Sequence, residues 1–162
     1  QQAKAAEVFA GFSETAAKEK EHAWFGTAYT PSELSTPTAD NRAICHPFYL
    51  KRLNSVMDVD MSAALLMMSV GEARRRMVPR EKWVFLHGCS QGNDRIEILE
   101  RPSFSSSMGI RFAGARALKM AGIKDVNQDI DFMDIYSCFP AAVQVACKEL
   151  GINMDEKPLT VT

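Results

Sequence analysis

The sequence predicts an α/β protein, in which helices pack against a sheet in an αβα layered arrangement. Three short apolar segments, at residues 63–69, 83–87 and 130–135, alternate with stretches that have helical periodicity. Such alternation is typical of domains built from strand–helix units. The chain has 162 residues, of which 46% are hydrophobic, so it is long enough to bury a core of its own.

The chain begins with a predicted amphipathic helix over residues 3–20. Val8, Phe9, Phe12 and Ala16 fall on one face of this helix, and Lys and Glu occupy the other face. The apolar face is expected to pack on the core.

From residue 21 to residue 46 the periodicity is lost. Thr, Ser, Pro and Asn dominate this stretch, which therefore forms an irregular segment near the N-terminus. A loop of this length in a compact domain is usually functional or disordered. The aromatic residues Trp24, Phe25 and Tyr29 indicate that parts of it dock on other residues.

Strands and helices are expected to alternate from residue 63 onward. The continuous apolar run 63–69 predicts a strand that is buried on both faces. A short basic helix follows over 69–77 and ends before Pro79, and 83–87 is the second apolar strand. Residues 105–121 predict a helix with Ser residues at its start, where they can cap it, and Gly122 as its stop.

The last predicted strand and helix are separated by only three residues. Residues 130–135 form the strand, and 139–150 form a helix with Pro140 at its start and Gly151 at its end. The apolar stripe of this helix consists of Phe139, Val143, Ala146 or Cys147, and Leu150.

Charge and hydropathy exclude several classes of protein. The net charge of −1 gives no basic footprint for nucleic acid. The longest apolar run, 63–68, is far too short to span a bilayer, and no basic, apolar leader opens the chain. We therefore expect a cytoplasmic protein that binds neither nucleic acid nor membrane, although an organelle is also compatible with the sequence.

The four cysteines, Cys45, Cys89, Cys138 and Cys147, match neither a zinc ribbon nor a redox C-x-x-C motif. In a chain of this length they are expected to be reduced thiols in a cytosol-like compartment. No metal site is predicted.

The first candidate site is the tripeptide Tyr136-Ser137-Cys138, which lies between a strand end and a helix N-terminus. Free N–H groups and the positive end of the helix dipole meet at such a junction and favour a developing negative charge. A Tyr hydroxyl or a Cys thiol placed there can also donate a proton. In the alternative, structural interpretation, Tyr136 is a strand-end aromatic residue and Cys138 fills the core.

Three further groups of residues are weaker candidates. His87 and Cys89 form a conceivable dyad at another strand end. The basic cluster Arg74, Arg75, Arg76, Arg80 and Lys82 could bind phosphate, or be the solvated face of a short helix. Asn54 and Ser55, with Asp58 and Asp60, either shape a turn or point into a cleft.

The chain resembles the thiolase superfamily in two regions. Residues 54–69, N-S-V-M-D-V-D-M-S-A-A-L-L-M-M-S, are similar to the thiolase pattern N-A-S-G-x-N-D-G-A-A-A-x-x-L-x-S. Residues 113–122 and 131–151 resemble the stretch that contains the N-E-A-F or H-D-C-F motif. The sequence Y-S-C-F-P-A-A-V-Q at 136–144 most resembles that of thiolase-like acetyl-CoA acetyltransferases related to the sterol-carrier-protein type.

The resemblance implies a partial thiolase-like αβα fold and a division into three parts. Residues 1–50 would be a loop-domain segment over the CoA site, 51–88 the end of the N-terminal half, and 89–162 the start of the C-terminal half. The chain would then be a central piece of such an enzyme. Its implied partners are acyl-CoA and either the rest of the thiolase chain or a complementary subunit, in a homo-oligomer.

The implied activity is an acetyl-CoA C-acetyltransferase-like reaction of lipid metabolism, a Claisen condensation or thiolytic cleavage of CoA thioesters. The CoA thioester is the substrate, and no other cofactor is implied. In the family a Cys nucleophile takes the acyl group, but none of the four cysteines here matches it. The nucleophile segment would precede residue 1, and the G-H-P and second-Cys segments would follow residue 162, so the piece alone is expected to be inactive.

The chain departs from the family pattern at three positions. Tyr136 replaces the Asn or His that holds the oxyanion water, Ser137 replaces Glu or Asp, and Val56 replaces a Ser near the CoA. Two alternatives therefore stay open: a thiolase-like retro-aldol lyase that acts on CoA esters through Tyr, and a non-catalytic acyl-CoA-binding or scaffold subunit. The predicted catalytic residues are Tyr136, Ser137 and Cys138, and the predicted substrate-binding residues are Asn54, Ser55 and Phe139.

Overall fold

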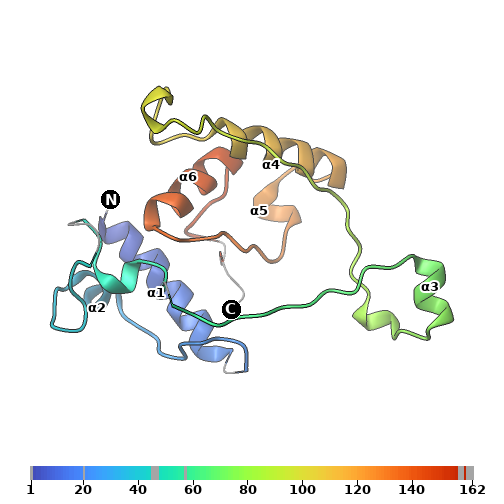
Figure 1. Ribbon diagram of the computed structural model, residues 1–162, viewed down its shortest axis with the longest axis horizontal. Coiled ribbons are helices and arrows are strands. Elements are labelled where there is room, and N and C mark those ends of the chain that lie inside the picture. Colours follow the sequence, from blue (N-terminus) through green and yellow to red (C-terminus); the bar gives the residue numbers. More distant parts are fainter. Residues whose placement is uncertain (1, 20, 45–47, 57, 157–158, 160–162) are drawn as a thin grey trace. The chain divides into compact units, whose positions relative to one another are not determined.

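The computed structural model describes residues 2–19, 21–44, 48–56, 58–156 and 159. The chain forms two compact units. The larger unit consists of residues 1–55 together with 88–162, and the smaller unit consists of residues 56–87. Figure 1 labels the helices of both units.

The N-terminal part of the larger unit is built on α1 (Gln2–Lys18), against which the short α2 (Pro31–Ser35) packs. Ala6 and Ala10 of α1 are buried with Leu34 of α2 and Leu53. Because alanine side chains are small, α2 can approach α1 closely at this face. The predicted helix is confirmed, but it buries two faces: the alanine face here, and Val8 and Phe12 in a second core.

The predicted loop over 21–46 contains an ordered helix that sequence reasoning missed. Thr30 caps α2: its hydroxyl accepts the N–H of Glu33, and the Glu33 carboxylate accepts the N–H of Thr30, which is a complete capping box. Pro31 occupies the first helical position, where its missing N–H costs nothing. A proline in the stretch that was predicted to be irregular therefore begins a helix. A short 3₁₀ helix, η1 (Lys51–Leu53), ends this region.

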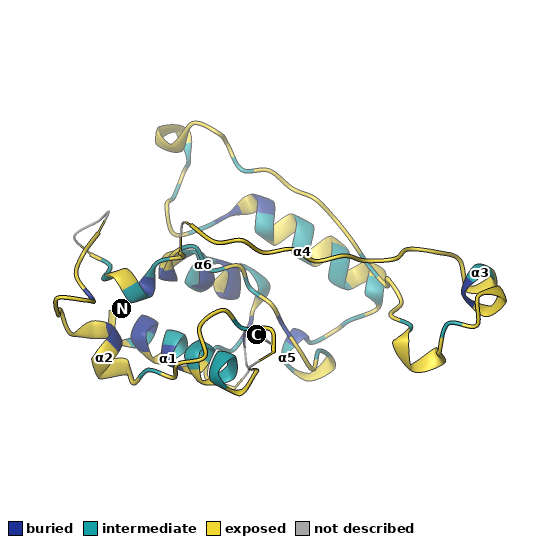
Figure 2. Cartoon of the chain, turned by 60° about the horizontal axis from the view of Figure 1, so that its bottom comes forward, coloured by how far each residue is buried: buried dark blue, intermediate teal, exposed yellow. Residues whose placement is uncertain are grey.

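The second core of the larger unit contains residues of three helices. These are α4 (Met108–Ala121), α5 (Val126–Asp129) and α6 (Pro140–Leu150). The predicted stripe of the last helix is largely confirmed, since Val143, Ala146 and Cys147 are buried and Leu150 is half-buried. Figure 2 shows the buried residues of α6 in dark blue. Gly122 and Gly151 end α4 and α6 in the left-handed conformation that glycine favours.

A polar network fixes the start of α4. The Ser107 hydroxyl caps the helix by accepting the N–H of Ile110, and it donates to Asp94 at 2.5 Å. The carboxylate of Glu149, almost inaccessible in α6, accepts the N–H of Ser107 and pairs with Arg111 at 2.6 Å. These bonds lock the N-terminus of α4 onto the C-terminal half of α6.

The smaller unit contains α3 (Val70–Arg75), capped by the Ser69 hydroxyl, and the 3₁₀ helix η2 (Arg80–Lys82). The Arg80 guanidinium lies over the rings of Trp83 and Phe85, at 4.5 and 4.8 Å from their centroids. Another 3₁₀ helix, η3 (Ile98–Glu100), belongs to the larger unit.

The three predicted strands are not formed in the described part of the chain, so the predicted αβα layering is not observed there. Residues 63–69, 83–87 and 130–135 are extended or irregular, and the β pairing present is an isolated bridge between Ala43 and Leu50. The physical reason is that a strand needs a hydrogen-bonded neighbour. The predicted helices formed because their hydrogen bonds are local.

Candidate functional site

The structure brings together the two segments that the sequence suggested as site residues. The backbone N–H of Ser55 donates to the carbonyl oxygen of Cys138 at 3.1 Å. This bond places the Asn54-Ser55 turn directly beside the Tyr136-Ser137-Cys138 tripeptide. The two motifs therefore belong to one site within the larger unit.

A second contact supports this junction. The ring of Tyr49 stacks on the ring of Phe139, with centroids 6.3 Å apart and an interplanar angle of 20°. Tyr49 thus fixes the residue that immediately precedes α6. Sequence reasoning missed Tyr49, because it carries no motif and its partner lies far along the chain.

Tyr136 is exposed and does not pack into the core. In the segment 132–136, Met133 is buried and Ile135 is half-buried, whereas Phe132 and Tyr136 are exposed. This alternation is the pattern of a strand with one face on the core, and the N–H of Ile135 donates to the carbonyl of Leu159 at 3.0 Å. With 78% of its surface exposed, Tyr136 is accessible to a ligand and is not a core aromatic residue.

The N-terminus of α6 adjoins Tyr136 and lacks a side-chain cap. Phe139 occupies the capping position without a side-chain hydrogen bond, and Pro140 follows as the first helical residue. In the residues that the structure describes, the N–H of Ala141 has no hydrogen-bond acceptor. The helix therefore offers a free donor and the positive end of its dipole beside the tripeptide.

Asn54 contributes a polar atom that is buried without a partner. Its side-chain N–H donates to the carbonyl of Leu50 at 2.8 Å, which fixes the orientation of the amide. Its Oδ1 is buried and meets no donor among the described residues. Ser55 itself is exposed.

The cysteines differ in accessibility. Cys147 is buried in α6, and burial raises the pKa of its thiol, which disfavours a nucleophilic thiolate. Cys138 is half-buried and therefore only partly fills the core. Cys89 is exposed. Cys45 falls outside the described residues.

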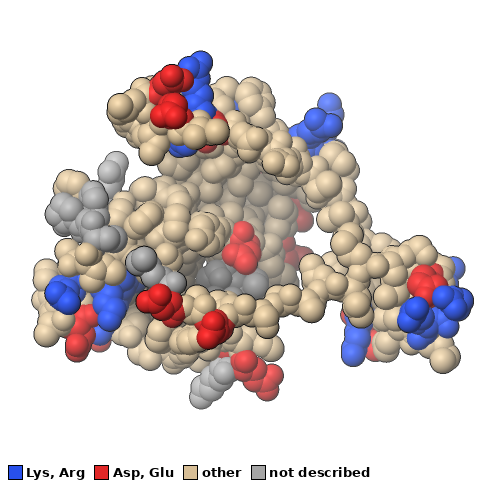
Figure 3. Space-filling model, in the orientation of Figure 1, with Lys and Arg blue, Asp and Glu red and all other residues tan. Residues whose placement is uncertain are grey.

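The remaining candidates form no recognisable site. His87 and Cys89 are both exposed, and no contact joins them in the described residues. In the basic cluster, Arg75 and Arg76 pair with Glu72, and Figure 3 shows acidic and basic atoms side by side in this unit. The described residues contain no group of three or more His, Cys, Asp or Glu that could hold a metal ion.

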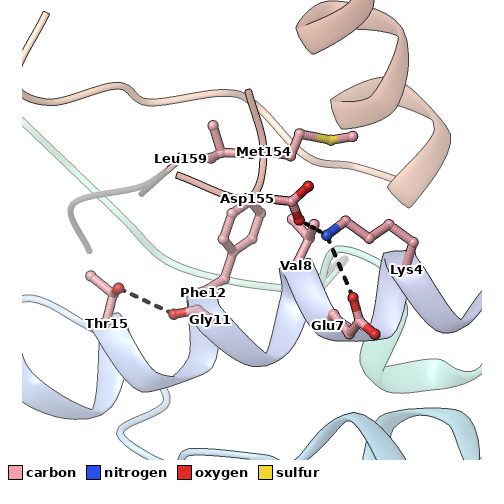
Figure 4. A pocket seen from close by; sticks show the side chains of 9 residues that line it. All are labelled: Lys4, Glu7, Val8, Gly11, Phe12, Thr15, Met154, Asp155 and Leu159. Atoms are coloured by element: carbon pink, nitrogen blue, oxygen red, sulfur yellow. Dashed lines mark hydrogen bonds and ion pairs between the residues drawn. The ribbon is translucent and has the colours of Figure 1, made fainter. Parts of the chain in front are cut away.

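A hollow of about 300 Å³ lies elsewhere in the larger unit, along α1. Val8, Gly11 and Phe12 line its helical side, and Met154 and Leu159 lie opposite (Figure 4). Asp155 and Glu7 both pair with Lys4 at its edge, and this raises the pKa of the ammonium group. None of the predicted site residues lines this hollow, and its cation is already neutralised.

No helix in the described ranges has the length and apolarity needed to cross a membrane.

Comparison with known proteins finds similarity to thiolase-like proteins, and no family model matches. A solved structure, a monomeric SCP2-thiolase-like protein type 1 from Mycobacterium smegmatis, is 36% identical and superposes with a TM-score of 0.82. The match covers 99% of this chain and 34% of that protein. A curated acetyl-CoA acetyltransferase from Methanocaldococcus jannaschii is 26% identical over 108 residues, which are 67% of this chain and 26% of that protein.

These matches confirm the resemblance to thiolase-like proteins of the sterol-carrier-protein type. They also place the chain at about a third of the length of the solved relative and about a quarter of the curated one.

Proposed function

We propose that this chain, which resembles SCP2-thiolase-like proteins over nearly its full length, supplies part of the active site of an acyl-CoA acyltransferase of the thiolase type. The reaction would be acetyl-CoA C-acetyltransferase-like, a Claisen condensation or a thiolytic cleavage. The observation that carries the proposal is the Ser55–Cys138 hydrogen bond, because it joins the two thiolase-like motifs into one site.

The proposed chemistry rests on charge that develops at a thioester carbonyl. When the nucleophilic Cys attacks this carbonyl, the oxygen gains negative charge until the CoA thiolate leaves. The same charge develops when the carbon nucleophile attacks the acyl-Cys thioester and the Cys thiolate leaves. The exposed Tyr136 hydroxyl can donate a hydrogen bond to that oxygen, and the uncapped N-terminus of α6 favours the same charge. The tripeptide would line the reacting group, and Asn54, Ser55 and Phe139 would line the CoA.

The chain would need other residues to complete this reaction. Cys147 is buried with a raised pKa, and no cysteine here matches the family nucleophile. We therefore expect the 162-residue chain alone to be inactive, and its implied partners are acyl-CoA and either the rest of the thiolase chain or a complementary subunit. Homo-oligomer formation, a cytoplasmic location, a role in lipid metabolism and the three-part division at residues 50 and 88 remain predictions.

A retro-aldol lyase acting on CoA esters is the second candidate. The observation that favours it is the exposed Tyr136, since a phenol can act as acid or base where an amide or imidazole usually binds water. If the absence of a nucleophilic Cys held for the whole protein, a subunit that only binds acyl-CoA would be favoured instead.

The test is the Tyr136→Phe substitution in the full-length protein, together with the rest of the thiolase chain or the complementary subunit that completes the site. We expect kcat to fall by about 10²-fold or more while KM for the acyl-CoA changes little, because the lost hydrogen bond acts on the transition state. The matched control is Phe132→Leu, another exposed aromatic position on the same face. It should leave kcat unchanged.

Equal kcat values for Tyr136→Phe and the unmodified protein would contradict the catalytic role. Products separate the first two candidates, since an acyltransferase releases CoA from one thioester whereas a lyase releases a carbonyl compound and retains the thioester. Calorimetry with acetyl-CoA then distinguishes a protein that binds without turnover.

A further inference from the structure

Tyr49 connects the two cores of the larger unit. It is half-buried, and on one side it packs against the N-terminal core, which consists of Ala6, Ala10, Leu34 and Leu53. On the other side its ring stacks on Phe139, the residue that immediately precedes α6. Because α6 contributes Val143 and Cys147 to the second core, Tyr49 links the N-terminal core to the helix that begins at the candidate site.

The segment that carries Tyr49, residues 49–55, is held in place by contacts with the N-terminal part of the chain. The backbone N–H of Arg52 donates to Oδ1 of the buried Asn41 at 3.1 Å. The Arg52 guanidinium lies over the ring of Tyr29, 4.5 Å from its centroid. Leu53 is buried. A segment that is fixed in this way can act as a support for the residues that it contacts.

This segment contacts two consecutive residues of the candidate site. The N–H of Ser55 donates to the carbonyl oxygen of Cys138 at 3.1 Å, and Tyr49 stacks on Phe139 with an interplanar angle of 20°. A single hydrogen bond leaves the peptide free to rotate about it, whereas the ring contact at the next residue removes this freedom. Tyr136 lies two residues before Cys138, so its position depends on both contacts.

We infer that Tyr49 is a positioning residue for the reaction proposed above. It acts through Phe139, because the stacked ring holds the peptide at residues 138–140 and thereby sets how the Tyr136 hydroxyl and the N-terminus of α6 face the substrate. The inference rests on the proposed function, since the position of Tyr136 affects turnover only if its hydroxyl acts on the reacting group. The hold on the peptide can be measured without turnover.

The first measurement is hydrogen exchange at the Ser55 amide of the full-length protein, because this N–H binds the Cys138 carbonyl. Tyr49→Leu removes the ring and should speed this exchange on the order of tenfold. Tyr49→Phe keeps the ring and should exchange at the rate of the unmodified protein. The matched control is Phe12→Leu, which removes a ring contact with Phe9 at 5.2 Å within α1. It should leave exchange at Ser55 unchanged.

A double-mutant cycle tests whether the effect passes through the stack. Phe139→Leu removes the same ring contact from the other side, so it should also speed exchange at Ser55. The double variant should exchange no faster than the faster single variant, because both substitutions remove one shared interaction. Phe139→Leu also gives the exchange result if Tyr49→Leu does not fold.

The second measurement is turnover of the acyl-CoA substrate by the same full-length variants. Tyr49→Leu should lower kcat by about tenfold or more, because Tyr136 is no longer held where the charge develops. Tyr49→Phe should retain the kcat of the unmodified protein. Phe12→Leu should lower the thermal midpoint as Tyr49→Leu does but leave kcat unchanged, which separates positioning from a general loss of stability.

Two results would overturn the inference. One is exchange at Ser55 that is as slow in Tyr49→Leu as in the unmodified protein. The other is an unchanged kcat in Tyr49→Leu under conditions in which Tyr136→Phe lowers it. If Tyr136→Phe itself leaves kcat unchanged, the proposed function fails, and the exchange rates alone then decide whether Tyr49 holds the peptide before α6.

Discussion

Asn41 illustrates how one buried side chain organises the irregular N-terminal segment. Its amide N–H groups donate to the carbonyl oxygens of Glu33, Leu34 and Thr36 at 3.0–3.2 Å, and its Oδ1 accepts the N–H of Arg52 at 3.1 Å. The Asn41 side chain is fully buried, so water does not reach the carbonyl groups at the positions where Asn41 binds them. Asn41 thereby joins the end of α2 to η1, which precedes Asn54 and Ser55.

We therefore expect Asn41→Ala to lower the free energy of unfolding by about 2–4 kcal/mol, because several buried partners lose their hydrogen bonds at once. Urea denaturation followed by circular dichroism measures the change. Asn93→Ala serves as the control, since Asn93 is exposed, and should shift the free energy by less than about 0.5 kcal/mol. Similar values for the two variants would contradict the role given to Asn41.

At the scale of elements, close backbone approach sets how α4 packs. A Cβ atom on Gly92 would lie 2.6 Å from the carbonyl oxygen of Gly109, in the first turn of α4. The contact is with backbone, so no side-chain rotation can relieve it. The Asp94 carboxylate beside it accepts the N–H of Gly109 at 2.9 Å, and this bond would be displaced together with the segment around Gly92.

Gly92→Ala should therefore destabilise the chain by about 1–3 kcal/mol through overpacking. Gly11→Ala provides a control of opposite sign. Gly11 lies within α1 with no atom within 4 Å of its added Cβ, so alanine should stabilise the helix by about 0.5–1 kcal/mol. Thermal unfolding compares both variants with the unmodified chain, and a shift of the same sign in both would be inconsistent with this explanation.

The elements that could be predicted from the sequence are those whose hydrogen bonds are local. The helices at 2–18, 108–121 and 140–150 follow local periodicity, a serine cap at Ser107 and glycine stops, and the structure confirms them within a few residues. The strands depend on pairing with distant partners, which no local pattern specifies, and within the described residues none of them forms a sheet ladder. The start of α6 directly after the Tyr136-Ser137-Cys138 tripeptide was predictable from Pro140, whereas the contacts of Cys138 with Ser55 and of Phe139 with Tyr49 were not, because they join segments far apart in sequence.

At the scale of the whole molecule, carboxylates connect elements of the larger unit. The Ser107 hydroxyl and then the Gly109 N–H lower the pKa of Asp94, and Arg111 and then the Ser107 N–H lower that of Glu149. The N–H groups of Asp125 and Lys124 lower the pKa of Asp129. All three groups favour folding only while they are ionised.

The sign of the pH dependence follows from these directions. A carboxyl group whose pKa is lower in the folded state stabilises the protein above the unfolded value of about 4, and the contribution is lost as pH falls through the folded pKa. We expect the urea midpoint to be constant from about pH 7 to 5 and to fall progressively below about pH 4. Asp94→Asn should be less stable at pH 7 and lose less on acidification. A midpoint that is independent of pH down to about pH 2 would contradict this linkage.

The two attachment points of the smaller unit have a consequence for how the chain tolerates changes in length. Ser55, just before that unit, is held by the Cys138 carbonyl, and Gly88, just after it, lies so close to α4 that a Cβ would meet the Ala117 carbonyl oxygen at 2.3 Å. Both ends of the excursion are therefore fixed in the larger unit. Residues can be inserted or deleted between them, as in the turn around Met77, without shifting the register of the Tyr136 junction. We therefore expect this excursion to tolerate changes in length, whereas replacing Gly88 with a larger residue should displace it from α4.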